Sequence, residues 1–184
     1  FSLNAANILT ARELFALGCE ILTPTHDLNA AQLKGLAEGA GSDRIEVVAY
    51  HHLPVFHTEH CVFARFLSNG KSYLDCGRPC EEHRVALRDT AGRSHPVLAD
   101  VGCRNTVFGA EAQQASAHLA AWRDAGIGRY RLEFAHESPQ QVLGVTRAFE
   151  DALAGLLTSG ELASRLRKVA PSGITEGSLK VLAG

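Results

Sequence analysis

The sequence predicts an α/β protein, built as part of a TIM-like β/α barrel with an inserted Cys/His-rich segment and a β-hairpin. Short apolar runs alternate with loops and amphipathic stretches at both ends of the chain, as in parallel strands covered by helices. Residues 51 to 105 interrupt this alternation. A chain of 184 residues is too short for eight β/α units, so we expect a partial barrel; an open doubly wound sheet is the alternative.

The first predicted units lie before residue 51. Thr10 can cap a helix over "ARELFALG", which ends at Gly18, and "CEILT" follows as a short buried strand. Asp27 is the expected cap of the next helix, "LNAAQLKGLAEG", whose leucines fall roughly on one face. "RIEVVAY" is then the second strand of the alternation.

The alternation resumes after the inserted segment, which itself holds a predicted hairpin, "HRVALRDTAGRSHPVLAD". "EAQQASAHLAAWRDAG" predicts a helix that ends at Gly126, and "RYRLEF" predicts a strand. "SPQQVLGVTRAFEDALAGLL" predicts a long helix with Ser138 as its cap and Pro139 at its first position. The rest is rich in Gly, Ser and Lys, so we expect one domain over residues 1–158 and a tail or linker over 159–184.

The composition is that of an ordinary globular domain without a strong net charge. A net charge of −2 excludes a general electrostatic attraction to nucleic acid or to membranes. No apolar run could span a bilayer and no secretory signal opens the chain, so we expect a cytoplasmic protein without a membrane partner. The chain contains no methionine, so we expect it to work with the remainder of a parent chain or with a partner subunit.

Polar residues follow the predicted strands. In parallel sheets the loops after the carboxyl ends of the strands form the working face, and here they include His26, His51 and His52. We expect the stretch "GCRNT", residues 102–106, on the same face. The residues predicted to bind a substrate are Asn4, Asn7, Asp27, Arg78, Arg104 and Asn105.

The inserted segment contains four of the five cysteines, Cys61, Cys76, Cys80 and Cys103. The Cys76-Gly-Arg-Pro-Cys80 spacing lets the chain turn back, so that both thiolates can face one centre. Four thiolates suit zinc or an iron–sulfur cluster, because both are soft centres that prefer sulfur. The sequence therefore predicts a metal site on these cysteines, with free thiols as the alternative.

The stretch "HHLPVFHTEHCVFARF", residues 51–66, places His57, Glu59 and His60 next to Cys61. Its spacing differs from the H-E-x-x-H helix of zinc proteases. We expect Glu59 to act as a general base beside the metal or to orient its neighbours. His57 and His60 are expected in either a catalytic or a structural role.

Two arginines adjoin the candidate ligands. Arg78 lies between two of the cysteines and Arg104 follows a third. A guanidinium in such a place can bind an anion or lower the pKa of a thiol. The alternative is that these arginines only balance carboxylates such as Asp75 and Glu81.

Three stretches, "HLPVFHTEHCVFARFLS", "DCGRPCEEHRVALRD" and "DVGCRNTVFGAEAQ", resemble the U32 family of collagenase-like peptidases. The resemblance covers about residues 1 to 157. The positions that match the family's pattern are Glu46, Leu53, Cys61, Cys76 and Cys80. Pro54 stands where the family has a cysteine, and Glu59 stands where glycine is usual. Cys103 is the natural replacement for the missing ligand.

The resemblance implies a β/α-barrel catalytic domain, often within a longer chain. Some members are described as proteases, and others resemble iron–sulfur proteins that hydroxylate tRNA, ribosomal RNA or ubiquinone precursors without oxygen. The resemblance therefore favours a [4Fe–4S] cluster, with RNA or a small aromatic molecule as substrate. Two alternatives stay open: a metal-dependent peptidase with zinc on the cysteines or histidines, and a non-enzymatic domain stabilised by its metal.

Overall fold

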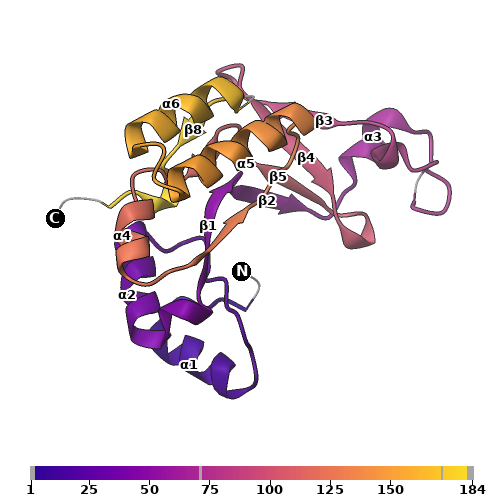
Figure 1. Cartoon of the computed structure of the whole chain (residues 1–184). Helices are drawn as coiled ribbons and strands as arrows, with labels where there is room; N and C mark the ends of the chain where they lie inside the picture. Colours follow the sequence, from indigo (N-terminus) through magenta and orange to yellow (C-terminus); the bar gives the residue numbers. More distant parts are fainter. Residues whose placement is uncertain (1–2, 71, 171, 182–184) are drawn as a thin grey trace.

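The computed structural model describes residues 3–70, 72–170 and 172–181 (Figure 1). Over these residues it is a mixed α/β fold with two sheets. The helices are α1 (Ile8–Ala16), α2 (Ala30–Ala40), α3 (Val62–Leu67), α4 (Leu119–Asp124), α5 (Pro139–Leu153) and α6 (Ser159–Val169). The strands are β1 (Glu46–His51), β2 (Pro54–Thr58), β3 (Val85–Arg88), β4 (Ser94–Ala99), β5 (Asn105–Phe108), β6 (Ala112–Gln114), β7 (Arg129–Leu132) and β8 (Ile174–Thr175).

The first sheet has the strand order β7-β1-β6-β8. Strand β1 runs parallel to β7, and Leu22 pairs in parallel with Ile45 directly before β1. Three segments of the predicted alternation thus lie side by side in the same direction. Strand β6 is antiparallel to β1, and the strands of the described residues form an open sheet, not a closed barrel. No helix in this part of the chain is long and apolar enough to cross a membrane.

The first two helices begin at residues other than those predicted. Asn7 caps α1, because its side chain accepts a hydrogen bond from the Thr10 backbone N–H at 2.9 Å. Asn29 caps α2 in a reciprocal capping box with Gln32, so the prediction of Asp27 as the cap was wrong. In each case an asparagine near the predicted cap supplies the acceptor.

The stretch from residue 111 to 126 is not the single helix that was predicted. Ala112–Gln114 form β6, and α4 begins only at Leu119. Strand β6 pairs with β1, which leaves Ala112 and Ala115 fully buried. This tertiary pairing outweighs the high helix propensity of the alanine-rich sequence. Helix α5, in contrast, begins with Ser138 and Pro139 as predicted.

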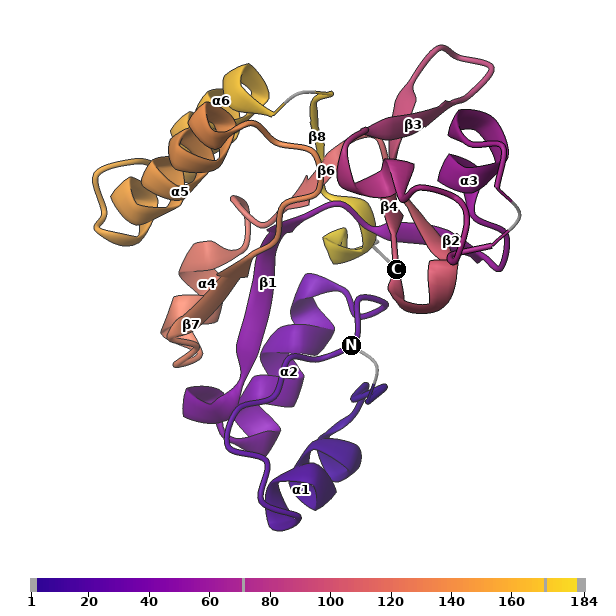
Figure 2. The same cartoon turned by 90° about the vertical axis from the view of Figure 1, so that its right-hand side faces the viewer.

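The segment expected to be a C-terminal tail or linker folds onto the domain instead. Helix α6 follows Thr158, which caps it, and lies beside α5 (Figure 2). Leu162 and Leu166 of α6 are fully buried in the main core, and strand β8 pairs with β6. Leu179 is also buried there. The described part of residues 159–184 is therefore a structural part of this domain.

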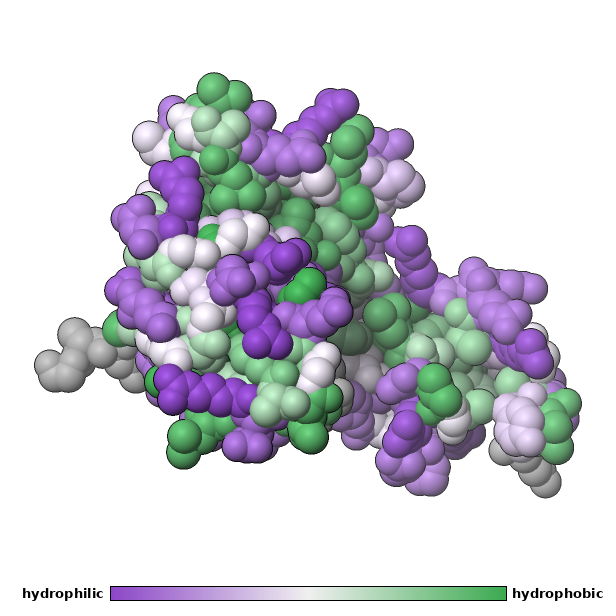
Figure 3. All heavy atoms as spheres, turned by 60° about the horizontal axis from the view of Figure 1, so that its bottom comes forward, coloured by the Kyte–Doolittle hydropathy of each residue, from purple (hydrophilic) through white to green (hydrophobic). Residues whose placement is uncertain are grey.

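The inserted segment forms the second sheet, with the order β2-β5-β4-β3 and antiparallel pairing throughout. Strands β3 and β4 are the predicted hairpin. We call residues 54–70 and 72–108 the cysteine lobe; it projects beyond the rest of the domain (Figures 1 and 2). Its own small core contains Phe63, Val97 and Val107. The projecting part carries hydrophobic side chains on its surface (Figure 3), including Phe66 and Leu74.

Candidate metal site in the cysteine lobe

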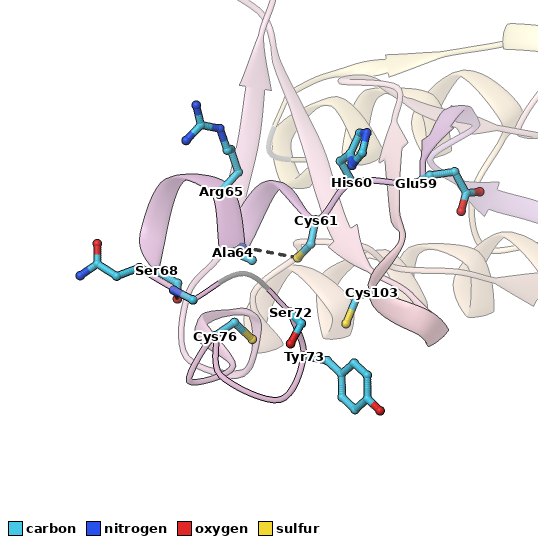
Figure 4. Close-up of a pocket in the computed structure, with 12 residues that line it drawn as sticks. Glu59, His60, Cys61, Ala64, Arg65, Ser68, Ser72, Tyr73, Cys76 and Cys103 are labelled. Atoms are coloured by element: carbon cyan, nitrogen blue, oxygen red, sulfur yellow. Dashed lines mark hydrogen bonds between the residues drawn. The ribbon is translucent and has the colours of Figure 1, made fainter.

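All four predicted metal ligands line one cavity of about 480 Å³. Cys61 precedes α3, Cys76 and Cys80 stand at the two ends of one turn, and Cys103 precedes β5. The sulfur atoms of Cys61, Cys76 and Cys103 point toward a common space (Figure 4). Segments that are up to 42 residues apart in the sequence (61 to 103) therefore present their thiols to the same volume.

A second hollow, of about 840 Å³, adjoins the same thiols. It shares Cys61, Cys76 and Cys103 with the first cavity and is also lined by Glu59 and His60. The Glu59 carboxylate is drawn pointing away from the sulfur atoms (Figure 4). Three thiols thus line both spaces. We call the space lined by all four cysteines the inner cavity, and the space lined by Glu59 and His60 the adjoining hollow.

Left-handed backbone turns direct two of the thiols inward. Gly77 and Arg78 both have positive φ, 68° and 51°, between Cys76 and Cys80. Gly102 and Cys103 repeat this arrangement, with φ of 78° and 61°. Non-glycine residues rarely adopt this conformation, and such strain concentrates at functional sites. The backbone of both cysteine loops is therefore strained, and packing within the lobe must offset this strain energy.

Gly70 holds the loop of Cys76 against the end of α3. A Cβ atom at this position would lie 2.3 Å from the Asp75 carbonyl oxygen and 2.6 Å from the Cys76 Cα. Backbone atoms cannot move away as a flexible side chain can. Only glycine therefore permits this close approach.

Asn105, which was predicted to bind substrate, is fully buried and lies beside Cys61. Its Oδ1 accepts a hydrogen bond from the Val62 N–H at 2.6 Å, at the start of α3. Its Nδ2 donates to the Arg104 carbonyl at 2.7 Å and lies 4.0 Å from the Cys61 sulfur. Asn105 thus ties β5 to the cysteine at the start of α3.

Of the other residues predicted on the lobe, Glu59, His60 and Arg78 line one of the two cavities, whereas His57 and Arg104 line neither. His57, on β2, lines neither cavity, and its Nδ1 is 2.8 Å from the Thr106 hydroxyl. Arg78 lines the inner cavity and pairs with Glu81 at 3.3 Å. Arg104 is exposed outside both cavities and donates to the Val101 carbonyl.

Asn4, Asn7 and Asp27 are not part of this site. Their segment lies with α1 and α2, apart from the cysteine lobe (Figure 1). Asn7 is used as a helix cap, and Asp27 accepts a hydrogen bond from Thr25. None of the three residues lines either of the two cavities at the cysteines.

The thiols are near enough to influence one another electrostatically. Burial raises the pKa of the Cys80 thiol, and the neighbouring Cys61 and Cys76 act in the same direction. Within the described residues, however, no three His, Cys, Asp or Glu side chains stand close enough to hold a single metal ion. The arrangement is a set of thiols around a cavity, not a closed one-ion site.

Comparisons with protein-family models, with curated proteins and with solved structures find no match to this chain. The resemblance to the U32 family therefore rests on the sequence motifs alone. What the structure adds is the placement of the motif cysteines around one cavity.

A second polar cluster, which sequence reasoning missed, lies where the chain passes between the two sheets. We call Tyr50, His52, Gly109 and Glu137 the joint. His52 Nε2 is 2.9 Å from Glu137 Oε1, and its Nδ1 is 2.7 Å from the Gly109 carbonyl oxygen. The Tyr50 hydroxyl donates to the same carboxylate at 2.9 Å. The partners of His52 are 57 and 85 residues away, so no local spacing could have indicated them.

The joint is a buried ion pair. Burial alone would raise the pKa of Glu137, but the hydrogen bond and charge of His52 lower it to about 2. Burial alone would lower the pKa of His52, but its hydrogen bonds to Glu137 and Gly109 raise it. Burial, together with the Glu137 charge, raises the pKa of Tyr50. The carboxylate is thus ionised and fully surrounded by donors.

Proposed function

We propose that the four cysteines of the lobe hold a [4Fe–4S] cluster. We further propose that the chain belongs to an iron–sulfur enzyme that hydroxylates RNA or a small aromatic precursor without oxygen. The observation that carries the proposal is the single cavity lined by all four thiols. Thiolate sets of this kind are typical of iron–sulfur clusters and of zinc. The sequence motifs favour the cluster through their resemblance to the U32 family.

The size of the shared cavity also supports the cluster. Zinc draws four thiolates around a single ion, whereas each thiolate of a [4Fe–4S] cluster binds a different iron atom. A cluster therefore needs its sulfurs around a larger volume. The four cysteines line a cavity of about 480 Å³, which offers such a volume.

When bound, the cluster would supply electron transfer. The side chains of the lobe would determine the polarity and charge around it. Phe63 and Pro79 are buried and line the inner cavity, so they give it apolar walls. Arg78 places a cation at the same cavity, where it would offset the negative charge of the thiolates. His60 lines the adjoining hollow, where an imidazole can donate or accept a proton near a substrate.

The wider setting is part of the same proposal. The parallel run of the Leu22 segment, β1 and β7 supports a partial TIM-like barrel. We propose that this unit acts within a longer chain or beside a partner subunit, in the reducing cytoplasm. Such a compartment keeps clustered thiols available for a metal centre.

A zinc peptidase is the second candidate, because Glu59 and His60 line the hollow next to the thiols. A zinc ion saturated by four thiolates keeps no open position for water, so it would be structural. Catalysis would then fall to His60 and Glu59 alone. The orientation of Glu59 away from the sulfurs weighs against this candidate (Figure 4).

The test is purification without oxygen, followed by iron, sulfide and zinc analysis and an absorbance spectrum. The proposal predicts iron and sulfide in matching amounts and a brown protein that loses its absorbance in air. Zinc without iron would contradict it. For the reaction, hydroxylated nucleosides and small phenols are compared by mass spectrometry in cells that express the chain or its Cys76→Ser variant. The hydroxylated products are expected only with the native cysteines.

A further inference from the structure

Asn105 is a fully buried polar residue of the cysteine lobe, and its neighbours fix the direction of its side-chain amide. The atom that lies 2.6 Å from the Val62 backbone N–H must be the oxygen, because a backbone N–H only donates. The atom that lies 2.7 Å from the Arg104 carbonyl must be the nitrogen, because a carbonyl only accepts. Two independent contacts therefore determine the same orientation.

These two contacts leave one N–H group of the amide for another acceptor. The Cys61 sulfur lies 4.0 Å from Nδ2 and is its other hydrogen-bond partner among the described residues. A neutral thiol is a weak acceptor, which agrees with the length of this contact. Hydrogen bonds to an ionised acceptor are shorter and roughly twice as strong. This N–H group is therefore placed where it gains most when the Cys61 sulfur carries negative charge.

The Cys61 sulfur also accepts a hydrogen bond from the Ala64 backbone N–H, at 3.5 Å. The Cys76 sulfur accepts one from the Arg78 backbone N–H, at 3.4 Å. Both of these donors belong to the backbone next to the cysteine that they contact. Asn105 differs from them, because it is a side-chain donor from a segment 44 residues away. A substitution can therefore remove this donor and leave the backbone around Cys61 in place.

The same amide joins two of the cysteine segments. The Arg104 carbonyl, which accepts from Asn105, also accepts a hydrogen bond from the Asp100 backbone N–H at 2.8 Å. This bond closes the turn that carries Cys103. Asn105 is thus held by the turn of one cysteine while it donates to the sulfur of another, Cys61, so the donor is positioned before any metal binds.

We propose that Asn105 raises the reduction potential of the cluster by donating its second N–H to the Cys61 sulfur. The inference rests on the cluster proposed above. When bound, the cluster would take up one electron from a low-potential one-electron donor, which adds one negative charge to the centre and its thiolates. The Asn105 donor stabilises this charge, and no covalent bond forms or breaks. Hydrogen bonds to the sulfur atoms are among the factors that set such potentials. Asn105 acts through Cys61 and is therefore a positioning residue.

Asn105→Asp separates the donor to sulfur from the anchoring of the side chain. The two side chains have nearly the same shape, but a carboxyl group carries at most one hydrogen. Burial favours the neutral carboxyl, which can still accept from Val62 and donate to Arg104 and lacks only the hydrogen that faces Cys61. An ionised carboxylate would place a negative charge beside the sulfur. Both forms shift the potential in the same, negative direction.

The first test is a redox titration of protein purified without oxygen, with dithionite as the electron donor and EPR spectroscopy as the readout. Asn105→Asp is expected to lower the equilibrium constant for reduction by roughly tenfold, which moves the midpoint potential by about 59 mV to more negative values. Thr106→Val is the matched control, because Thr106 is the next residue of β5, is also buried and contacts His57 through its hydroxyl. Successive side chains of a strand point to opposite faces, so this variant should keep the native midpoint. An unchanged midpoint in Asn105→Asp would overturn the proposal.

A second measurement needs no substitution of Asn105. The native chain is labelled with ¹⁵N in its asparagine side chains and reduced, and pulsed EPR then detects coupling between ¹⁵N and the unpaired electron. The coupling is expected in the native chain and also in Asn69→Ser, since Asn69 is the asparagine that lines the adjoining hollow. A cluster without this coupling, or a coupling that disappears in Asn69→Ser, would overturn the role of Asn105 alone. A native chain without iron and sulfide would overturn the proposed function, and this inference with it.

Discussion

The joint and the cysteine lobe differ in how their reactive groups are satisfied. At the joint, the Glu137 carboxylate receives hydrogen bonds from His52, Tyr50 and the Ala135 backbone N–H, and its side chain is fully buried. In the lobe, four thiols turn toward a cavity of about 480 Å³, and all four are only partly buried. The joint is complete without any further component, whereas the lobe presents ligands to a space that its own atoms do not fill.

This difference separates a structural polar cluster from a candidate functional one. Buried charges that are fully paired rigidify a fold, and their loss is expected to appear as lost stability. Thiols that point into a cavity from strained loops do not stabilise the fold by themselves. Substitution of these cysteines should therefore lower mainly the metal content of the protein and not its stability. Substitutions in the joint and in the lobe can test this division.

Glu137→Ala should cause the largest loss of stability. It leaves the His52 imidazolium buried without its counter-charge, and breaking a buried pair in this way costs about 3–5 kcal/mol. Chemical denaturation followed by circular dichroism measures the change. The exposed Glu150→Ala on α5 is the matched control and should change stability by less than about 0.5 kcal/mol. If the two substitutions lowered the free energy of unfolding equally, the buried ion pair of the joint would not be a major contribution to stability.

The joint should also make stability depend on pH. The pKa of Glu137 falls from its ordinary 4.5 to about 2 on folding, so its contribution is complete above pH 4.5 and is lost as the pH falls toward 2. The pKa of His52 is raised on folding, so its contribution is complete below its ordinary value of 6.5 and is lost as the pH rises through the folded value.

The difference in unfolding free energy between the native chain and Glu137→Gln should therefore be greatest between about pH 4.5 and 6.5. Thermal unfolding of both proteins across pH 3 to 9 measures it. A difference that does not vary with pH would contradict the ionised pair.

Gly70→Ala should destabilise the cysteine lobe. The added methyl group would meet the Asp75 and Cys76 backbone, and such overpacking costs about 1–3 kcal/mol. Hydrogen exchange should show faster opening in α3 and the Cys76 loop, with β1 and α5 unchanged. Gly35→Ala on α2 is the control: nothing lies within 4 Å of its Cβ position, and alanine there should stabilise the helix by up to about 1 kcal/mol. A uniform change across the chain would contradict a lobe-specific effect.

The sequence predicted the features that depend on local patterns. The strands β1 and β7, the β3–β4 hairpin and the start of α5 follow from apolar periodicity, turn residues and the Ser138–Pro139 cap. The thiols could be grouped because most of them are close in the sequence. The beginning of α6 was also detectable, since Thr158 and Glu161 form a capping box, but the surrounding Gly and Ser obscured it.

Long-range contacts account for the rest. Strand β6 lies in an alanine-rich stretch whose local preference is helical, and only its pairing with β1 makes it a strand. Asn105 looked like an exposed polar residue, but β5 buries it behind Cys61. Glu137 contacts His52 although the whole cysteine lobe lies between them in the sequence. Such contacts carry no local signal.

A substitution of Cys103 tests the four-cysteine centre most directly, because Cys103 has no counterpart in the family's motif and lines the same cavity as the other three cysteines. Iron and sulfide per chain are measured in the native protein, in Cys103→Ser and in Cys19→Ser, all purified without oxygen. Cys19 lies outside the lobe and lines neither cavity, so its variant is the matched control. The account predicts native iron and sulfide in Cys19→Ser and a strong loss of both in Cys103→Ser. Full iron and sulfide in Cys103→Ser would contradict the four-cysteine centre.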